Sequence, residues 1–180
     1  VLHEGQPITK ANVHHTEENG IGPLAGDEVH AMYRFSSGAM GYFDSVRDAG
    51  AKGPLRFGVQ LFGTKGTLRW TDTELFMSTA HYLPDPLWDT ARSDKEWIPV
   101  SSAGIGVPEP LHGENTHHPG NVLAINDLIA AVEEDREPLA SLEKARTNLE
   151  MIVGVFESQR LGRPVNFPLE NRANPLTMLG

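Results

Sequence analysis

The sequence predicts an α+β fold, with an open, mainly antiparallel β-sheet and two C-terminal helices packed on one face of it. Two observations predict this class. Between Glu28 and Met77, apolar and polar residues alternate with the period of a strand, and short turns separate the segments. After Pro119 the period changes to that of a helix, in two successive segments. Strands first and helices last, without βαβ alternation, are typical of an α+β domain.

The first half of the sheet is expected to contain a β-hairpin. A short strand candidate, Thr9 to His15, precedes a polar, Gly-rich loop from Thr16 to Gly26. The segment from Glu28 to Phe35 then alternates, with Val29, Ala31, Tyr33 and Phe35 on one side and His30, Met32 and Arg34 on the other. Ser36-Ser37-Gly38 supplies turn residues, and Ala39 to Val46 is the returning strand.

Further strands are expected to follow in immediate succession. Leu55 to Phe62 and Thr67 to Trp70 flank the tight turn Gly63-Thr64-Lys65-Gly66, and Glu74 to Met77 comes after a second turn at Asp72. Strands joined by turns this short pair antiparallel.

The segment from Ser78 to Pro119 is expected to be irregular. It holds many of the prolines, and only Glu96 to Val100 resembles a strand. A loop this long is either functional or packs against another part of the molecule.

Two helices are expected to close the fold. In the first, Val122, Ile125, Ile129 and Val132 recur at helical spacing before the charged run at 133–136. In the second, Ser141 is the expected N-cap, and Gly162 followed by Pro164 is the expected stop. Val165 to Leu169 is predicted as an edge strand, because Pro168 cannot donate to a central ladder.

Composition excludes several classes of protein. A net charge of −9 argues against a nucleic-acid partner. The apolar runs are far shorter than the ~20 residues that a membrane span needs. The absence of cysteine removes disulfides, thiolate nucleophiles and Cys-ligated zinc.

We expect a cytoplasmic protein. The first residues, Val1 to Gly5, contain no start methionine and no signal sequence, so the chain is expected to be a fragment of a longer one.

Arg47 is a candidate for binding substrate. It follows the strand from Ala39 to Val46, and an Arg at the mouth of a strand can hold a carboxylate or sugar hydroxyls with its planar fork. A salt bridge with Asp44 or Asp48 is the alternative.

The densest polar cluster contains the histidines before the first helix. It consists of His112, His117 and His118 with Glu114 and Asn115. Histidine and carboxylate bind divalent metals, and histidine also transfers protons near neutral pH. The spacing matches no established metal motif, and a metal-dependent enzyme built on this cluster is kept as an alternative reading. His14 and His15 are adjacent on a strand and point to opposite faces, which argues against a shared metal ion.

Three stretches resemble the C-terminal domain of the Gfo/Idh/MocA oxidoreductases, the family of glucose-fructose oxidoreductase and inositol dehydrogenase. The first, from Gly26 to Gly41, is similar to the hairpin of that family with its F-x-x-G-A turn. The second, from Val59 to Leu68, is similar to its G-T-x-G turn. The third, from Asn121 to Pro168, includes Arg136-Glu137-Pro138-Leu139 and a closing S-x-x-x-G-x-x-V at 158–165.

The resemblance implies one C-terminal substrate-binding and oligomerisation domain over residues 1–180. NAD or NADP would be bound mainly by an N-terminal Rossmann domain, which carries G-x-G-x-x-G at the start of a helix. Here residues 20–22 and 104–106 give only G-x-G, flanked by loop residues. We therefore expect no cofactor-binding, catalytic or metal-binding residue in this chain, and no activity of the isolated fragment.

The resemblance also implies partners. The substrate would be a sugar, polyol or related hydroxyl compound, contacted by the loops from Ala49 to Pro54 and from Leu111 to His118. The second loop enters the first helix and would face the substrate cleft, which makes His117 and His118 the expected substrate-binding residues there. The Rossmann domain of the same protein would be a second partner. We expect a homo-oligomer through the open sheet face, because the helices cover only the other face. The alternative to an oxidoreductase domain is a non-catalytic binding or dimerisation module.

Overall fold

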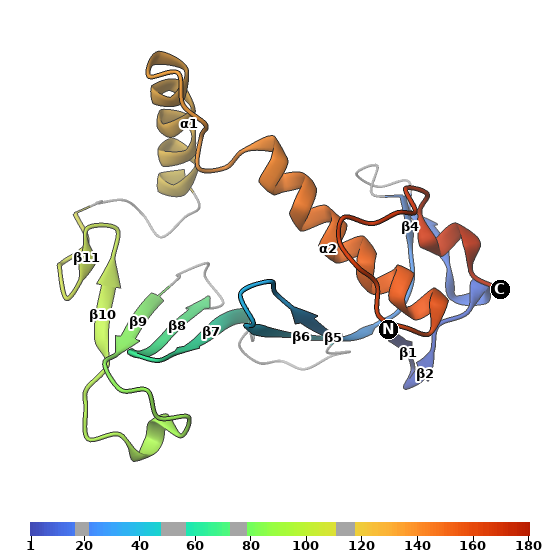
Figure 1. Ribbon diagram of the computed structural model, residues 1–180, viewed down its shortest axis with the longest axis horizontal. Coiled ribbons are helices and arrows are strands. Elements are labelled where there is room, and N and C mark those ends of the chain that lie inside the picture. The colour runs from blue at the N-terminus through green and yellow to red at the C-terminus, as the bar shows by residue number, and fades with distance from the viewer. Residues whose placement is uncertain (17–21, 48–56, 73–78, 111–117) are drawn as a thin grey trace. The chain divides into compact units, whose positions relative to one another are not determined.

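The computed structural model describes residues 1–16, 22–47, 57–72, 79–110 and 118–180 (Figure 1). The chain divides into two units. The first comprises Val1–Ala51 and Ala140–Gly180, and the second comprises Lys52–Leu139.

A four-stranded antiparallel sheet forms the first unit, in the order β2-β1-β5-β6. Its strands are β1 (Leu2–His3), β2 (Gln6–Pro7), β5 (Glu28–Arg34) and β6 (Met40–Val46). The predicted hairpin is confirmed, with Gly38 at φ 87° in the turn. Burial alternates along β5 as the sequence predicts, because every second side chain faces the interior.

The N-terminal strand prediction is wrong in part. Residues Lys10–Asn12 form a 3₁₀ turn, η1, because the Asn12 side chain accepts the Thr9 N–H at 2.8 Å and closes the chain locally. Only β3 (His14–Thr16) is extended, and it pairs with β4 (Gly22–Leu24), which lies inside the segment expected to be a loop.

Helix α2 (Leu142–Leu161) begins and ends where the sequence predicts. Ser141 accepts the Lys144 N–H with its side chain, and Gly162 ends the helix in the left-handed conformation at φ 62°. The predicted edge strand from Val165 to Leu169 is absent. Phe167 instead lies against α2 at Gly154, where an added Cβ would stand 2.6 Å from the ring, and Leu169 is buried.

The core of the first unit lies between the hairpin, α2 and the C-terminal 3₁₀ turn η4 (Pro175–Met178). Its buried members are Val1, Ile8, Ala25, Leu176 and Leu179, with Val13, Val29, Val155 and Phe156 packed against them. The Tyr33 hydroxyl donates to the Met151 carbonyl of α2 at 3.1 Å. The face of β5 that carries Val29 and Tyr33 is therefore the face that α2 covers (Figure 1).

A five-stranded antiparallel sheet forms the second unit, in the order β11-β10-β9-β8-β7. Its strands are β7 (Phe57–Gly63), β8 (Gly66–Asp72), β9 (Thr79–Leu83), β10 (Ile98–Ser101) and β11 (Gly104–Ile105). The turn from Gly63 to Gly66 is confirmed, and the predicted strand from Glu74 to Met77 lies outside the described residues. Strands β9 and β11 correct the expectation that 78–119 holds a single strand. Their pairing with β8 and β10 stabilises segments that have a weak local pattern.

Opposite residues in the register show that this sheet has one apolar and one mainly polar face. The apolar face carries Phe57, Val59, Leu61, Leu68, Trp70, Ala80, Tyr82, Ile98, Val100 and Ile105. On the other face, Arg69 stacks on the Trp97 ring at 4.3 Å, and Phe62 stacks on Trp88 at 4.2 Å. The irregular segment between β9 and β10 therefore packs against the mainly polar face.

Helix α1 (His118–Glu133) confirms the first predicted helix. Arg136 closes its end by donating to Asp127 at 2.9 Å and to Glu134 at 2.6 Å, and Asp127 also accepts the Leu139 N–H at 2.6 Å. These contacts explain the charged motif from Arg136 to Leu139 in structural terms.

The predicted α+β class is confirmed, with antiparallel sheets and two helices in the C-terminal part of the chain. Over the described ranges the strands form sheets of four, five and two strands. That residues 1–180 act as one domain stays a prediction. Among the helices in the described part of the chain, none is long and apolar enough to cross a membrane. The cytoplasmic location stays a prediction.

Candidate functional site

The S-x-x-x-G-x-x-V motif at residues 158–165 forms the C-terminal end of α2 and the segment that leaves it, which we call the α2 exit. The Ser158 hydroxyl donates to the Arg163 carbonyl at 2.9 Å, and the Arg163 N–H donates to the Ser158 carbonyl at 3.3 Å. Gly162 supplies the left-handed turn between them. The motif therefore fixes the direction in which Arg163, Pro164 and Val165 leave the helix.

A cavity of about 470 Å³ lies in the first unit beside this exit. It is lined by residues 30–33 of β5, by the C-terminal half of α2 and by the segment that follows Gly162. Its polar groups come from the terminal amine of Val1 and from His30, Tyr33, Ser158, Gln159 and Arg163. The size lies in the usual range for small-molecule sites, about 300–1,000 Å³.

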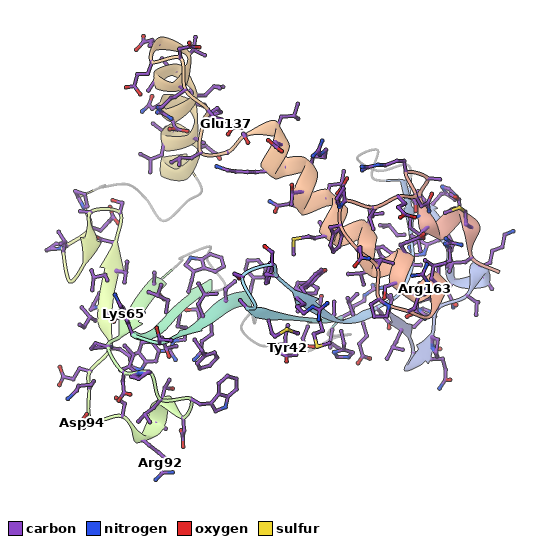
Figure 2. The ribbon with its side chains drawn as sticks, viewed as in Figure 1. Tyr42, Lys65, Arg92, Asp94, Glu137 and Arg163 are labelled. Atoms are coloured by element: carbon purple, nitrogen blue, oxygen red, sulfur yellow. The ribbon has the colours of Figure 1, made fainter. Side chains whose placement is uncertain are left out.

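The polar groups of this cavity are donors and neutral acceptors. Tyr33 donates to Met151, and burial raises the pKa of its hydroxyl. Gln159 accepts from the main-chain nitrogen of Val1 at 3.0 Å. Arg163, labelled in Figure 2, makes no ion pair with a residue in the described part of the chain. No carboxylate lines the cavity. The arrangement suits the binding of a hydroxyl-bearing or anionic molecule.

A buried ion pair supports the same helix end. Glu157 is only 4% exposed and accepts two hydrogen bonds from Arg160, both at 2.8 Å. The bonds from Arg160 lower the pKa of Glu157, with a smaller contribution from the Asn171 amide. The Asn171 nitrogen is buried and makes no hydrogen bond of standard geometry with a described residue, so its contribution comes from proximity.

On β5, His30 lies between two carboxylates. Its Nδ1 is 2.7 Å from Asp44 and its Nε2 is 2.5 Å from Glu28. A carboxylate only accepts hydrogen bonds, so both ring nitrogens must carry a proton for both contacts to form. The hydrogen bonds to Asp44 and then to Glu28 raise the pKa of His30. The contacts are those of an imidazolium between two carboxylates, and we call the group the His30 cluster.

The structure places Arg47 directly after β6. Its N–H donates to the Asp27 carbonyl at 2.7 Å, and its side chain is exposed. Asp44 binds His30 rather than Arg47, and Asp48 lies outside the described residues. Substrate binding by Arg47 stays a prediction.

Most of the predicted histidine cluster falls outside the described residues. His112, His117, Glu114 and Asn115 lie there, as do the loop from Ala49 to Pro54 and residues 111–117. His118 is the first residue of α1. The roles of His117 and His118 stay predictions. Within the described ranges, no group of three His, Asp or Glu side chains is arranged to hold a metal ion.

The sequence analysis missed the His30 cluster and the cavity. The cluster had a signal, because a hairpin that turns at Gly38 pairs position 30 with position 44. The cavity had none, because it depends on how α2 packs against β5.

The G-x-G stretch at residues 104–106 does not have the structure of a dinucleotide-binding loop. Gly104 and Ile105 form β11, which pairs with β10 in a hairpin and leads into no helix N-terminus. Such a terminus is what holds a pyrophosphate in dinucleotide-binding folds. Gly20 lies outside the described residues.

Comparison with known families gives a match over residues 2–167 to a family described as "Oxidoreductase family, C-terminal alpha/beta domain". Comparisons with curated proteins and with solved structures give no significant match. The family match spans the hairpin, the Gly63–Gly66 turn and the α2 exit, which are the three stretches that carry the resemblance. The chain therefore belongs to the Gfo/Idh/MocA oxidoreductase family and carries its C-terminal domain.

Proposed function

We propose that this chain is the substrate-side domain of an NAD(P)-dependent oxidoreductase that acts on a sugar, a polyol or a related hydroxyl compound. The family match over residues 2–167 carries the proposal. The cavity beside the α2 exit is consistent with it, because Gln159 and Arg163 are groups that bind hydroxyls and anions.

Arg47, His117 and His118 are proposed as further substrate contacts. Arg47 has an exposed side chain at the end of β6, with its main chain fixed by Asp27. A guanidinium can bind a substrate with two parallel donors, which Lys cannot reproduce.

The cofactor would be held mainly by a Rossmann domain of the same protein, and the G-x-G stretch at residues 104–106 supports this because it forms a β-hairpin rather than a loop that opens a helix. The cofactor supplies hydride transfer, and the role of this chain is to bind and orient the substrate. We further propose that the protein forms a homo-oligomer through an open sheet face.

An activity assay on the product of the complete gene tests the proposal. Sugars and polyols are incubated with NAD⁺ or NADP⁺, and formation of the reduced nicotinamide is followed by absorbance. We expect turnover of at least one compound, and we expect Arg47→Gln to raise its KM by about tenfold while kcat changes less.

Lys10→Gln is the matched control, because Lys10 is an exposed cation in the 3₁₀ turn η1, away from β6. Turnover with neither nucleotide over a broad panel would contradict the oxidoreductase assignment. An unchanged KM in the Arg47 variant would remove only the role of that residue.

A further inference from the structure

The cavity beside the α2 exit has a one-sided set of charged groups. The terminal amine of Val1, the imidazole of His30 and the guanidinium of Arg163 can each carry a positive charge. None of the lining residues, all of which lie in the described part of the chain, is acidic. A site lined by cations and by no carboxylate favours an anionic ligand over a cationic one.

Two of these positive groups already have partners. His30 lies between Glu28 and Asp44, so the charge of its imidazolium is balanced within the His30 cluster. The Val1 amine donates to Gln159 at 3.0 Å, and burial lowers the pKa of this amine. Neither group therefore offers a full positive charge to a ligand.

The charge of Arg163 is not balanced in this way. Its acidic neighbour is Glu157, whose pKa is lowered mainly by the hydrogen bonds from Arg160 and to a smaller extent by the charge of Arg163. Both oxygens of Glu157 accept from Arg160 at 2.8 Å, and Arg163 makes no ion pair with a residue in the described ranges. Within those ranges, no acidic group competes with a ligand for the parallel donors of Arg163.

The main chain of Arg163 is fixed at the wall of the cavity. Its carbonyl accepts the Ser158 hydroxyl at 2.9 Å, and its N–H donates to the Ser158 carbonyl at 3.3 Å. Neither bond uses the guanidinium. The Arg163 side chain can therefore be replaced while the α2 exit keeps its hydrogen bonds.

The other polar groups of the cavity suit hydroxyls. Gln159 uses its carbonyl oxygen for Val1, so its amide nitrogen can donate to a ligand. Tyr33 gives its proton to the Met151 carbonyl, so its oxygen can accept from a ligand hydroxyl. Apolar side chains such as Phe167 form the rest of the wall. This mixture matches a carbon skeleton that carries hydroxyls and a carboxylate.

We propose that the ligand of this cavity is a sugar acid and that Arg163 binds its carboxylate. The inference rests on the proposed function and deepens it, because it narrows the substrate from hydroxyl compounds in general to those that carry a carboxylate. Arg163 sets this specificity, and Tyr33 and Gln159 contact the hydroxyls.

Isothermal titration calorimetry of the 180-residue chain with gluconate and with sorbitol tests the proposal. The two probes differ only in that gluconate has a carboxylate where sorbitol has a hydroxymethyl group. At low salt we expect the dissociation constant for gluconate to be lower than that for sorbitol by about tenfold or more. Arg163→Gln should raise the constant for gluconate by about tenfold and change that for sorbitol by less than about threefold.

Arg34→Gln is the matched control, because Arg34 is an exposed arginine of β5 that does not line the cavity. It removes the same charge from the chain and should leave both dissociation constants unchanged. Arg163→Lys keeps the charge but loses the planar fork, so its constant for gluconate should lie between those of the unmodified chain and Arg163→Gln.

Equal affinities for gluconate and sorbitol, or no binding of gluconate at millimolar concentration, would overturn the proposal. So would gluconate binding that Arg163→Gln leaves intact, or that Arg34→Gln weakens by the same factor. Turnover of neutral sugars alone in the nicotinamide assay would keep the proposed function and remove this narrowing. Gluconate binding at Arg163 without turnover of any compound would instead remove the oxidoreductase assignment, so the two failures are distinguishable.

Discussion

At the scale of single residues, α2 contains two Glu–Arg pairs at the same i, i+3 spacing in different environments. Glu157 is buried and accepts two bonds from Arg160 at 2.8 Å, whereas Glu143 is 73% exposed and lies 4.0 Å from Arg146. Desolvation makes the first pair sensitive to loss of a partner, while water screens the second.

Glu157→Gln is expected to lower the free energy of unfolding by about 2 kcal/mol at pH 7, because charge-assisted bonds to a buried carboxylate are lost. Glu143→Gln, the matched control, should change it by less than about 0.5 kcal/mol. Urea titrations of both variants measure the difference. Equal changes in the free energy of unfolding for the two substitutions would show that burial of Glu157 does not determine how much its ion pair contributes to stability.

The ion pair between Glu157 and Arg160 also predicts that the stability of the folded chain depends on pH. The pKa of Glu157 is lowered in the folded chain, so its stabilisation is present above the unfolded value of about 4.5 and is lost as pH falls through the folded value. The difference between the unmodified chain and Glu157→Gln should therefore shrink on acidification. A difference that stays constant below pH 4 would contradict the assigned shift.

At the scale of elements, the turn from Gly63 to Gly66 shows why two glycines of one motif are not equivalent. Gly66 has φ 150°, and a Cβ there would lie 2.2 Å from the Leu83 carbonyl oxygen of β9. At Gly63, an added Cβ would approach only the Gly66 carbonyl, at 3.3 Å. The second glycine is required by the close approach of a neighbouring strand.

Gly66→Ala is expected to destabilise the five-stranded sheet by about 3 kcal/mol, because the backbone of β9 cannot move away without breaking its pairing. Gly63→Ala should cost about 1 kcal/mol or less. Hydrogen exchange of the β8 and β9 amides reports the difference. Similar protection in the two variants would mean that the contact with Leu83 is not the constraint.

The same scale explains what the sequence could predict. The hairpin and α2 carry their own signals, such as the alternation along β5, Ser141 as the N-cap and Gly162 at the stop. Strand β9 depends on pairing with β8 and has little local pattern. The false edge strand after Pro164 had apolar residues, but Phe167 meets the space left by Gly154 on α2. The structures of β9 and of the segment after Pro164 both depend on contacts with segments that are distant in the sequence.

In the candidate site, too, features with a local sequence signal could be predicted and features that depend on distant contacts could not. The motif from Ser158 to Val165 was visible in the sequence, and the structure shows that it closes a helix. The cavity that this exit borders needs α2 docked on the hairpin, which no local pattern specifies. Arg47 was found from its position after a strand, and its partner in binding stays a prediction.

At the scale of the whole molecule, the proposed function assigns substrate binding and cofactor binding to two different parts of one protein. This chain carries the C-terminal domain of the family, and residues of its first unit line a cavity of small-molecule size. We propose that this chain binds the substrate while another domain of the same protein binds the nicotinamide cofactor.

Paired fluorescence titrations with NADH and NADPH test this claim most directly. One titration uses the 180-residue chain, and the other uses the product of the complete gene. The account predicts saturable binding of at least one nucleotide to the complete product and none to the 180-residue chain. Saturable, micromolar binding to the 180-residue chain, or no binding to the complete product, would contradict it.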